Sequence, residues 1–144
     1  MKKVLFSLLC GFVMGSNVSA QTCASPLPLV SGTWAYTGDT CSASNPLAAF
    51  GALISQQNDI VYSYVASGSE VFTIASNGGF FSGDPLVLLL PWCSNSADPI
   101  EFGMQGTSMN TSGVTVPGQQ YYVIVTADPS SPSNACGQYL MTVQ

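Results

Sequence analysis

The chain has 144 residues, of which 47% are hydrophobic and only 6% are charged, with seven acidic residues, two basic residues and no histidine. Lys2 and Lys3 are the two basic residues, so residues 4–144 carry acids alone. Binding to nucleic acid or to anionic lipid depends on Lys and Arg side chains, so both functions are excluded for residues 4–144. Ordinary carboxyl pKa values are about 4, so we expect no titration between about pH 6 and pH 9.

Residues 1–20 have the pattern of a secretory signal peptide. Lys2 and Lys3 precede an apolar run, residues 4–13, that is too short to span a bilayer. Val18-Ser19-Ala20 then supplies the small residues that signal peptidase recognises. We predict cleavage after Ala20, which leaves residues 21–144 as one soluble domain that is secreted, periplasmic or held at the cell surface.

Four cysteines lie in this segment: Cys23, Cys41, Cys93 and Cys136. An even number of cysteines in an exported chain predicts two disulfide bonds, and sequence allows three pairings. We favour Cys23 with Cys41, which closes a short N-terminal loop. Cys93 then pairs with Cys136, which ties the region of Trp92 to the last strand.

The rest of the sequence predicts a succession of short strands and contains no clear amphipathic helix. Residues 60–66 and 70–75 flank Ser67-Gly68-Ser69, and this pattern predicts a β-hairpin. Residues 86–90 are uniformly apolar, which predicts a strand buried on both faces. Further strands are expected at residues 31–37, 100–104, 121–126 and 137–143, with a short strand or helical turn in 47–54. Residues 77–85 and 105–112 are expected to be turns or loops.

These elements predict an all-β fold, an antiparallel β-sandwich of jelly-roll type with about seven to nine short strands. The order of several motifs resembles the bacterial pre-peptidase C-terminal domain, a secreted β-sandwich module. The motifs are Thr37-Gly38-Asp39-Thr40, residues 58–64, residues 84–88, residues 117–125 and residues 137–143. The resemblance implies an accessory domain without an active site; relatives usually follow secreted proteases or other exported enzymes, and some sugar-binding or collagen-binding modules look similar.

The acidic residues are candidates for catalysis or for metal binding. Serine and cysteine nucleophiles have no His or Lys to activate them, so only carboxylate chemistry is left, with Asp98 and Glu101 as the one close pair. Asp84, Asp98 and Asp128 each precede proline, where aspartate builds turns. We therefore predict that the chain is not an enzyme and has no resident cofactor. A calcium site is the alternative use of the acids, and its candidate ligands are Asp39, Asp59 and Asp84.

Aromatic side chains are the remaining candidates for binding, because stacking on a sugar ring or a peptide needs no positive charge. The candidates are Trp34, Tyr36, Trp92, Tyr121 and Tyr122. The alternative is that these residues fill the core, although Tyr121 and Tyr122 point to opposite faces of a strand. The predicted function is an exported, non-catalytic module that binds polysaccharide or extracellular protein. Alternatives are a structural subunit that pairs through an edge strand, and a carboxylate hydrolase.

Overall fold

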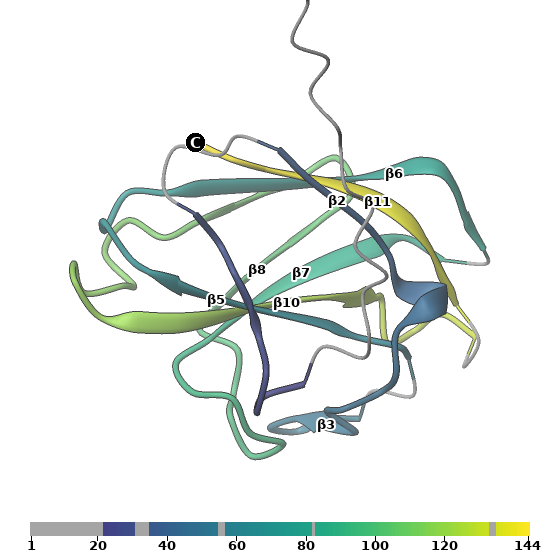
Figure 1. The fold of residues 1–144 in the computed structure, drawn as a ribbon, viewed down its shortest axis with the longest axis horizontal. Helices are drawn as coiled ribbons and strands as arrows, with labels where there is room; N and C mark the ends of the chain where they lie inside the picture. The colour runs from purple at the N-terminus through teal and green to yellow at the C-terminus, as the bar shows by residue number, and fades with distance from the viewer. Residues whose placement is uncertain (1–21, 31–34, 55–56, 82, 133–134) are drawn as a thin grey trace, which may run out of the picture.

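A computed structural model gives the fold and describes residues 22–30, 35–54, 57–81, 83–132 and 135–144. Two β-sheets pack against each other, as Figure 1 shows. One sheet has five strands in the order β1-β5-β10-β7-β8, and the other has four in the order β2-β11-β6-β9. The predicted all-β sandwich is therefore confirmed.

The strands of the five-stranded sheet are β1 (Leu27–Pro28), β5 (Ile60–Val65), β10 (Gln120–Ala127), β7 (Pro85–Leu90) and β8 (Glu101–Met104). Those of the four-stranded sheet are β2 (Ala35–Asp39), β11 (Cys136–Val143), β6 (Val71–Phe81) and β9 (Ser108–Asn110). A separate hairpin consists of β3 (Ala49–Phe50) and β4 (Leu53–Ile54). Within the described ranges, helix is confined to one 3-10 turn, η1 (Thr40–Ser42). Neighbouring strands are antiparallel except β1 and β5, which are parallel.

The inner core lies between the two sheets, and alternate residues of each strand point into it. The rings of Tyr64 on β5 and Phe72 on β6 meet edge to face with centroids 5.5 Å apart. The hydroxyls of Tyr62 and Tyr139 are 2.5 Å apart and share a buried hydrogen bond across the same space. This bond satisfies two polar groups that would otherwise be costly to bury.

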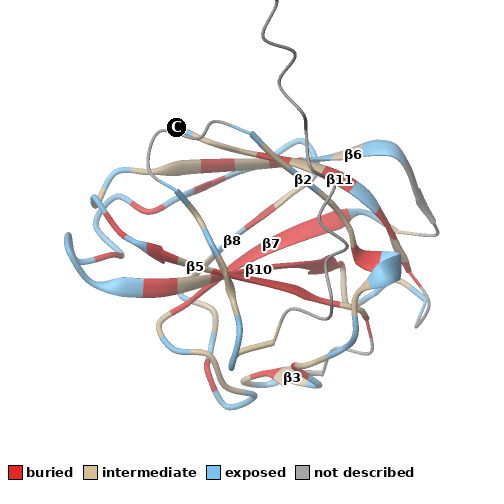
Figure 2. Cartoon of the chain, viewed as in Figure 1, coloured by how far each residue is buried: buried red, intermediate tan, exposed pale blue. Residues whose placement is uncertain are grey.

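A second apolar cluster lies on the outer face of the five-stranded sheet. Figure 2 shows that the central strands of this sheet are largely buried. Strand β7 contributes to both clusters, which confirms the prediction of a strand buried on both faces. Residues 44–54, which we call the cover, pack Leu47 and Phe50 onto this outer cluster. The cover includes β3, which lies below β5 and β10 in Figure 1. Its Gly51 N–H donates to the carbonyl of Asn95 at 3.2 Å.

The predicted hairpin of residues 60–66 and 70–75 is wrong, because β5 and β6 belong to different sheets. The turn itself is as expected, with Gly68 at φ 98°. Inner-core residues alternate along both runs and meet across the core, so the chain crosses from one sheet to the other. The backbone groups at the crossing bond elsewhere, for example Ala66 N–H to the carbonyl of Gln119 at 2.9 Å.

Two further expectations about local structure are wrong. Strand β6 continues through the Gly-rich segment to Phe81, where its pairing with β11 becomes irregular between Gly137 and Tyr139. The segment 105–112, expected as a loop, contains the three-residue strand β9. Both cases show long-range pairing overriding weak local propensity. No helix among the described residues is long and apolar enough to cross a membrane.

Candidate functional site

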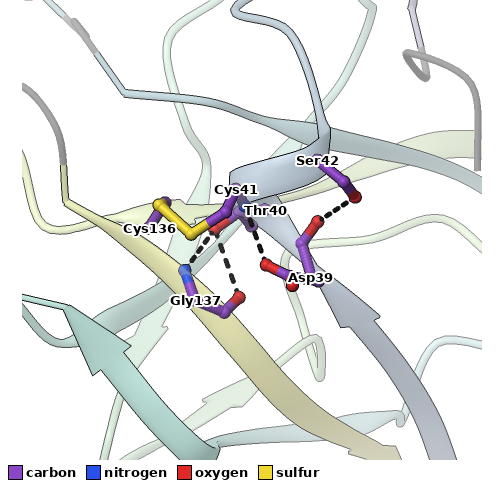
Figure 3. The surroundings of a disulfide bond; sticks show 6 residues. All are labelled: Asp39, Thr40, Cys41, Ser42, Cys136 and Gly137. Carbon is purple, nitrogen blue, oxygen red and sulfur yellow. Dashed lines mark hydrogen bonds between the residues drawn. A yellow bond between two sulfur atoms is a disulfide. The ribbon is translucent and has the colours of Figure 1, made fainter.

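The disulfide bonds join Cys23 to Cys93 and Cys41 to Cys136, so the pairing favoured from sequence is wrong. The physical reason is the path of the chain, which carries η1 beside the start of β11 (Figure 3). There the Thr40 hydroxyl accepts a hydrogen bond from the N–H of Gly137 at 3.0 Å. The same hydroxyl lies 3.3 Å from the Gly137 carbonyl oxygen, to which it donates. Two formed disulfides indicate an oxidising environment.

The five aromatic candidates do not gather at one place. Trp34 lies outside the described residues. The Tyr36 ring packs against Tyr62 with centroids 5.8 Å apart, and its hydroxyl donates to the carbonyl of Val30 at 3.0 Å. Tyr121 is buried in the inner core, whereas Tyr122 is half-buried against the outer cluster. Their opposite orientations are as predicted.

Trp92 is the candidate that faces solvent, with 56% of its surface exposed. It follows the end of β7, where the N–H of Ile100 donates to the carbonyl of Leu89 at 2.9 Å. Ile100 is 36% exposed and Phe102, on β8, is 55% exposed. We call Trp92, Ile100 and Phe102 the apolar strip.

The apolar strip lies at the β8 edge of the five-stranded sheet. Phe102 is directly opposite Leu88, whose side chain belongs to the outer cluster, so Phe102 also points outward. Ile100 directly precedes β8, and Trp92 is the second residue after β7, the strand that pairs with β8. Phe102 therefore extends the outer face of the sheet to solvent at this edge. Exposed large apolar side chains on neighbouring segments mark interaction sites more often than isolated ones do.

The calcium candidates are not brought together. Asp39 accepts a hydrogen bond from Cys41 N–H at 2.9 Å and begins η1, so it has a structural task. Asp84 is exposed, and its backbone carbonyl accepts from Asp128 N–H at 3.0 Å. Among the described residues, no three Asp, Glu or Cys side chains form a group suited to a metal ion. Asp59 differs from the exposed Asp84 in being completely buried.

Asp59 is completely buried, and neither of its carboxylate oxygens has a hydrogen-bond partner. Burial raises the pKa of Asp59 to about 7, against the opposing effects of the nearby Thr126 hydroxyl and Leu47 backbone. Neither group forms a hydrogen bond to the carboxylate, so burial has the larger effect on its pKa. The expectation that no acid titrates between about pH 6 and pH 9 is therefore wrong for this residue.

Glu70 organises the crossing between β5 and β6, a role that the sequence did not reveal. Burial alone would raise the pKa of Glu70, but hydrogen bonds from the Ser67 N–H and the Thr111 hydroxyl outweigh it and lower the pKa to about 2. The N–H of Gly68 donates to the same carboxylate at 3.2 Å. Glu70 is thus a structural carboxylate that stays ionised over most of the pH range.

The pair considered for hydrolysis has no special environment in the structure. Asp98 is exposed, and its Oδ1 occupies the space beside Gly51 where a Cβ would lie 1.7 Å away. Glu101 accepts a hydrogen bond from the N–H of Phe102 at 3.2 Å. What this region offers a ligand is an exposed apolar surface with acceptor groups at its margin.

No protein-family model, curated protein or solved structure matches the chain. The site must therefore be judged from its own residues. Sequence reasoning found Trp92 but missed Ile100 and Phe102. A signal for them exists, because Ile100-Glu101-Phe102 alternates apolar and charged residues, and an edge strand can expose its apolar face.

Proposed function

We propose that the chain is an exported, non-catalytic module that binds a neutral polysaccharide through the apolar strip. The observation that carries this proposal is the exposure of Trp92 and Phe102, at 56% and 55%, the first in the loop after β7 and the second on the neighbouring strand β8. Aromatic side chains displayed on a fixed scaffold can stack against sugar rings without a conformational change.

Charge narrows the class of ligand. Residues 4–144 contain no Lys, Arg or His, so an anionic polymer would meet only repulsion and no ion pairs. A neutral polysaccharide needs ring surfaces and hydrogen-bond acceptors, and the exposed Asp98 lies between Trp92 and Ile100 in the chain. An extracellular protein with an apolar patch is the second ligand class compatible with this surface.

Export supports the same proposal. The two disulfides require an oxidising environment, and residues 1–20 have the pattern of a cleaved signal peptide, although they lie outside the described residues. The resemblance to the pre-peptidase C-terminal domain is part of this proposal, because such modules accompany enzymes that act outside the cell. The proposed module would hold a polymer and leave its cleavage to another protein.

Affinity electrophoresis in gels that contain neutral polysaccharides tests the proposal. We expect a panel of β-glucans, xylan and galactomannan to include at least one polymer that retards the wild-type protein. Trp92→Ala and Phe102→Ala should each lower the affinity by about tenfold, which corresponds to the loss of one stacking contact of about 1.4 kcal/mol.

Val116→Ala is the matched control, because Val116 is also 56% exposed but lies in the loop before β10. Its affinity should equal that of the wild type. Equal loss of affinity in all three variants, or no retardation by any polymer together with binding of a matrix protein, would refute the polysaccharide proposal.

The edge of the four-stranded sheet favours a second candidate function, assembly through strand pairing. Strand β2 is an edge strand, and its residues Ala35 and Thr37 are exposed. An unprotected edge can add a strand from another chain. Sedimentation velocity at increasing protein concentration tests this candidate, which predicts a growing sedimentation coefficient that Thr37→Pro abolishes.

A further inference from the structure

A buried polar cluster lies beneath the cover, on the outer face of the five-stranded sheet. Asp59 directly precedes β5 and lies two residues before Val61, which belongs to the outer cluster. Thr126 lies two residues after Ile124, which belongs to the same cluster. Alternation along the strands therefore places Asp59 and Thr126 on this outer face, near the backbone of Leu47 in the cover.

The polar atoms of this cluster are unsatisfied. Both carboxylate oxygens of Asp59 and the hydroxyl of Thr126 are buried without hydrogen-bond partners, and both residues are 0% exposed. An ionised carboxylate in such a place is strongly disfavoured, whereas the protonated acid is much less costly to bury. Because Leu47 of the cover lies close to the carboxyl, a movement of the cover would admit water to it.

The cover is held to the sheet by contacts that can break without unfolding the sandwich. The Asp59 N–H donates to the carbonyl of Ser44 at 2.9 Å, and Gly51 N–H donates to Asn95 at 3.2 Å. Leu47 and Phe50 also pack on the outer cluster. The inner core contains no residue of the cover, so it does not depend on the cover staying closed.

We propose that Asp59 is a proton-gated lock: its protonated carboxyl lets the cover, residues 44–54, close over the outer face of the sheet, and its ionisation opens the cover. This inference does not depend on the proposed polysaccharide binding. Opening would expose Leu86, Leu88 and Ile124, which are buried when the cover is closed.

No other ionisable group near Asp59 contributes to its raised pKa, as a lock controlled by one proton requires. The ionisable side chains of the adjoining strands β5 and β10 are Tyr62, Tyr64, Tyr121 and Tyr122, and the loops next to the sheet carry Asp84, Asp98 and Asp128. None of them is among the causes of the raised pKa of Asp59, which is about 7 because of burial. Residues 4–144 contain no Lys, Arg or His that could neutralise the carboxylate in place.

Amide hydrogen exchange, corrected for its intrinsic pH dependence, tests the lock. The Gly51 amide reports opening of the cover, and amides of β6 and β11 report unfolding of the sandwich. The Gly51 amide should be less protected than those of β6 and β11. Its opening equilibrium should rise by a factor on the order of 50 from pH 5 to pH 7, and by only about twofold from pH 7 to pH 9.

Asp59→Asn keeps the size of the side chain and removes its titration, so the Gly51 opening equilibrium should become independent of pH. Asp84→Asn is the control, because Asp84 is exposed and its variant should keep the wild-type profile. The wild-type profile is decisive even if Asp59→Asn fails to fold: protection of Gly51 equal to that of β6 and β11 at every pH would overturn the proposal. A rise in Gly51 protection with millimolar Ca²⁺ at pH 8 would also overturn it, because the cluster would then be a cation site.

Discussion

At the scale of single residues, the inner core is sensitive to atoms added beside its tyrosines. A Cβ at Gly38 would lie 2.5 Å from the Tyr139 hydroxyl oxygen and 2.7 Å from the adjoining ring carbon. Tyr139 is fully buried and bonded to Tyr62, so it has little freedom to move. We predict that Gly38→Ala lowers the free energy of unfolding by about 2 kcal/mol, measured by urea denaturation.

Thr37→Ala is the control for this prediction, because Thr37 is exposed on the same strand and its variant should change stability by less than about 0.5 kcal/mol. Unchanged stability in Gly38→Ala would mean that Tyr139 is not fixed as described.

Alternation in the sequence was sufficient to place Tyr121 and Tyr122 on opposite faces. It could not identify Asp59 as fully buried, because that burial depends on how the chain packs over the outer face of the five-stranded sheet.

At the scale of elements, the disulfides join segments that are far apart in sequence. Cys23–Cys93 spans 70 residues and Cys41–Cys136 spans 95 residues. Because loop-closure entropy grows only with the logarithm of loop length, removing either bond with paired Cys→Ser substitutions should cost a similar amount, about 4 kcal/mol each. Urea denaturation of the two double variants measures these costs.

Mass spectrometry of unreduced chymotryptic fragments checks the disulfide pairing. A fragment that joins Cys23 to Cys41 would contradict the structure.

The strands could be predicted from sequence better than their partners could. Residues 86–90 and 121–126 were located because their apolar patterns are strong and local. The pairing of β5 and β6 was mispredicted because a short Gly-containing turn can close a hairpin or cross between sheets. That choice is made by the contacts of Tyr64 with Phe72 across the core. The cysteine pairing was missed for the same reason, since it depends on the path of the chain between sheets.

At the scale of the whole molecule, two carboxylates set the pH dependence of stability in opposite directions. The pKa of Glu70 is lowered to about 2, so its contribution is present above its ordinary pKa of 4.5 and is lost as pH falls toward 2. The pKa of Asp59 is raised from 3.8 to about 7, so its contribution is present below pH 3.8 and is lost as pH rises toward 7. The free energy of unfolding should therefore be greatest at about pH 4 to 5.

Urea denaturation from pH 2 to pH 9 measures this profile. Stability should fall by at most about 4 kcal/mol between pH 4 and pH 8, the limit set by a pKa shift of about three units at Asp59, and by less where opening of the cover relieves the buried charge. Asp59→Asn should remove that fall and leave the loss of stability at low pH. A wild-type maximum near neutral pH would contradict the assignment of a protonated, buried Asp59.

The central claim is that the molecule binds a neutral polymer through the apolar strip of the five-stranded sheet. The most direct measurement is a titration of the ¹⁵N-labelled protein with oligosaccharides of a polymer that retards it, followed by NMR chemical shifts. We predict that the largest shifts occur at the Trp92 indole N–H and at the amides of Ile100 and Phe102. Largest shifts on β2, or no shifts at saturating ligand, would contradict the account.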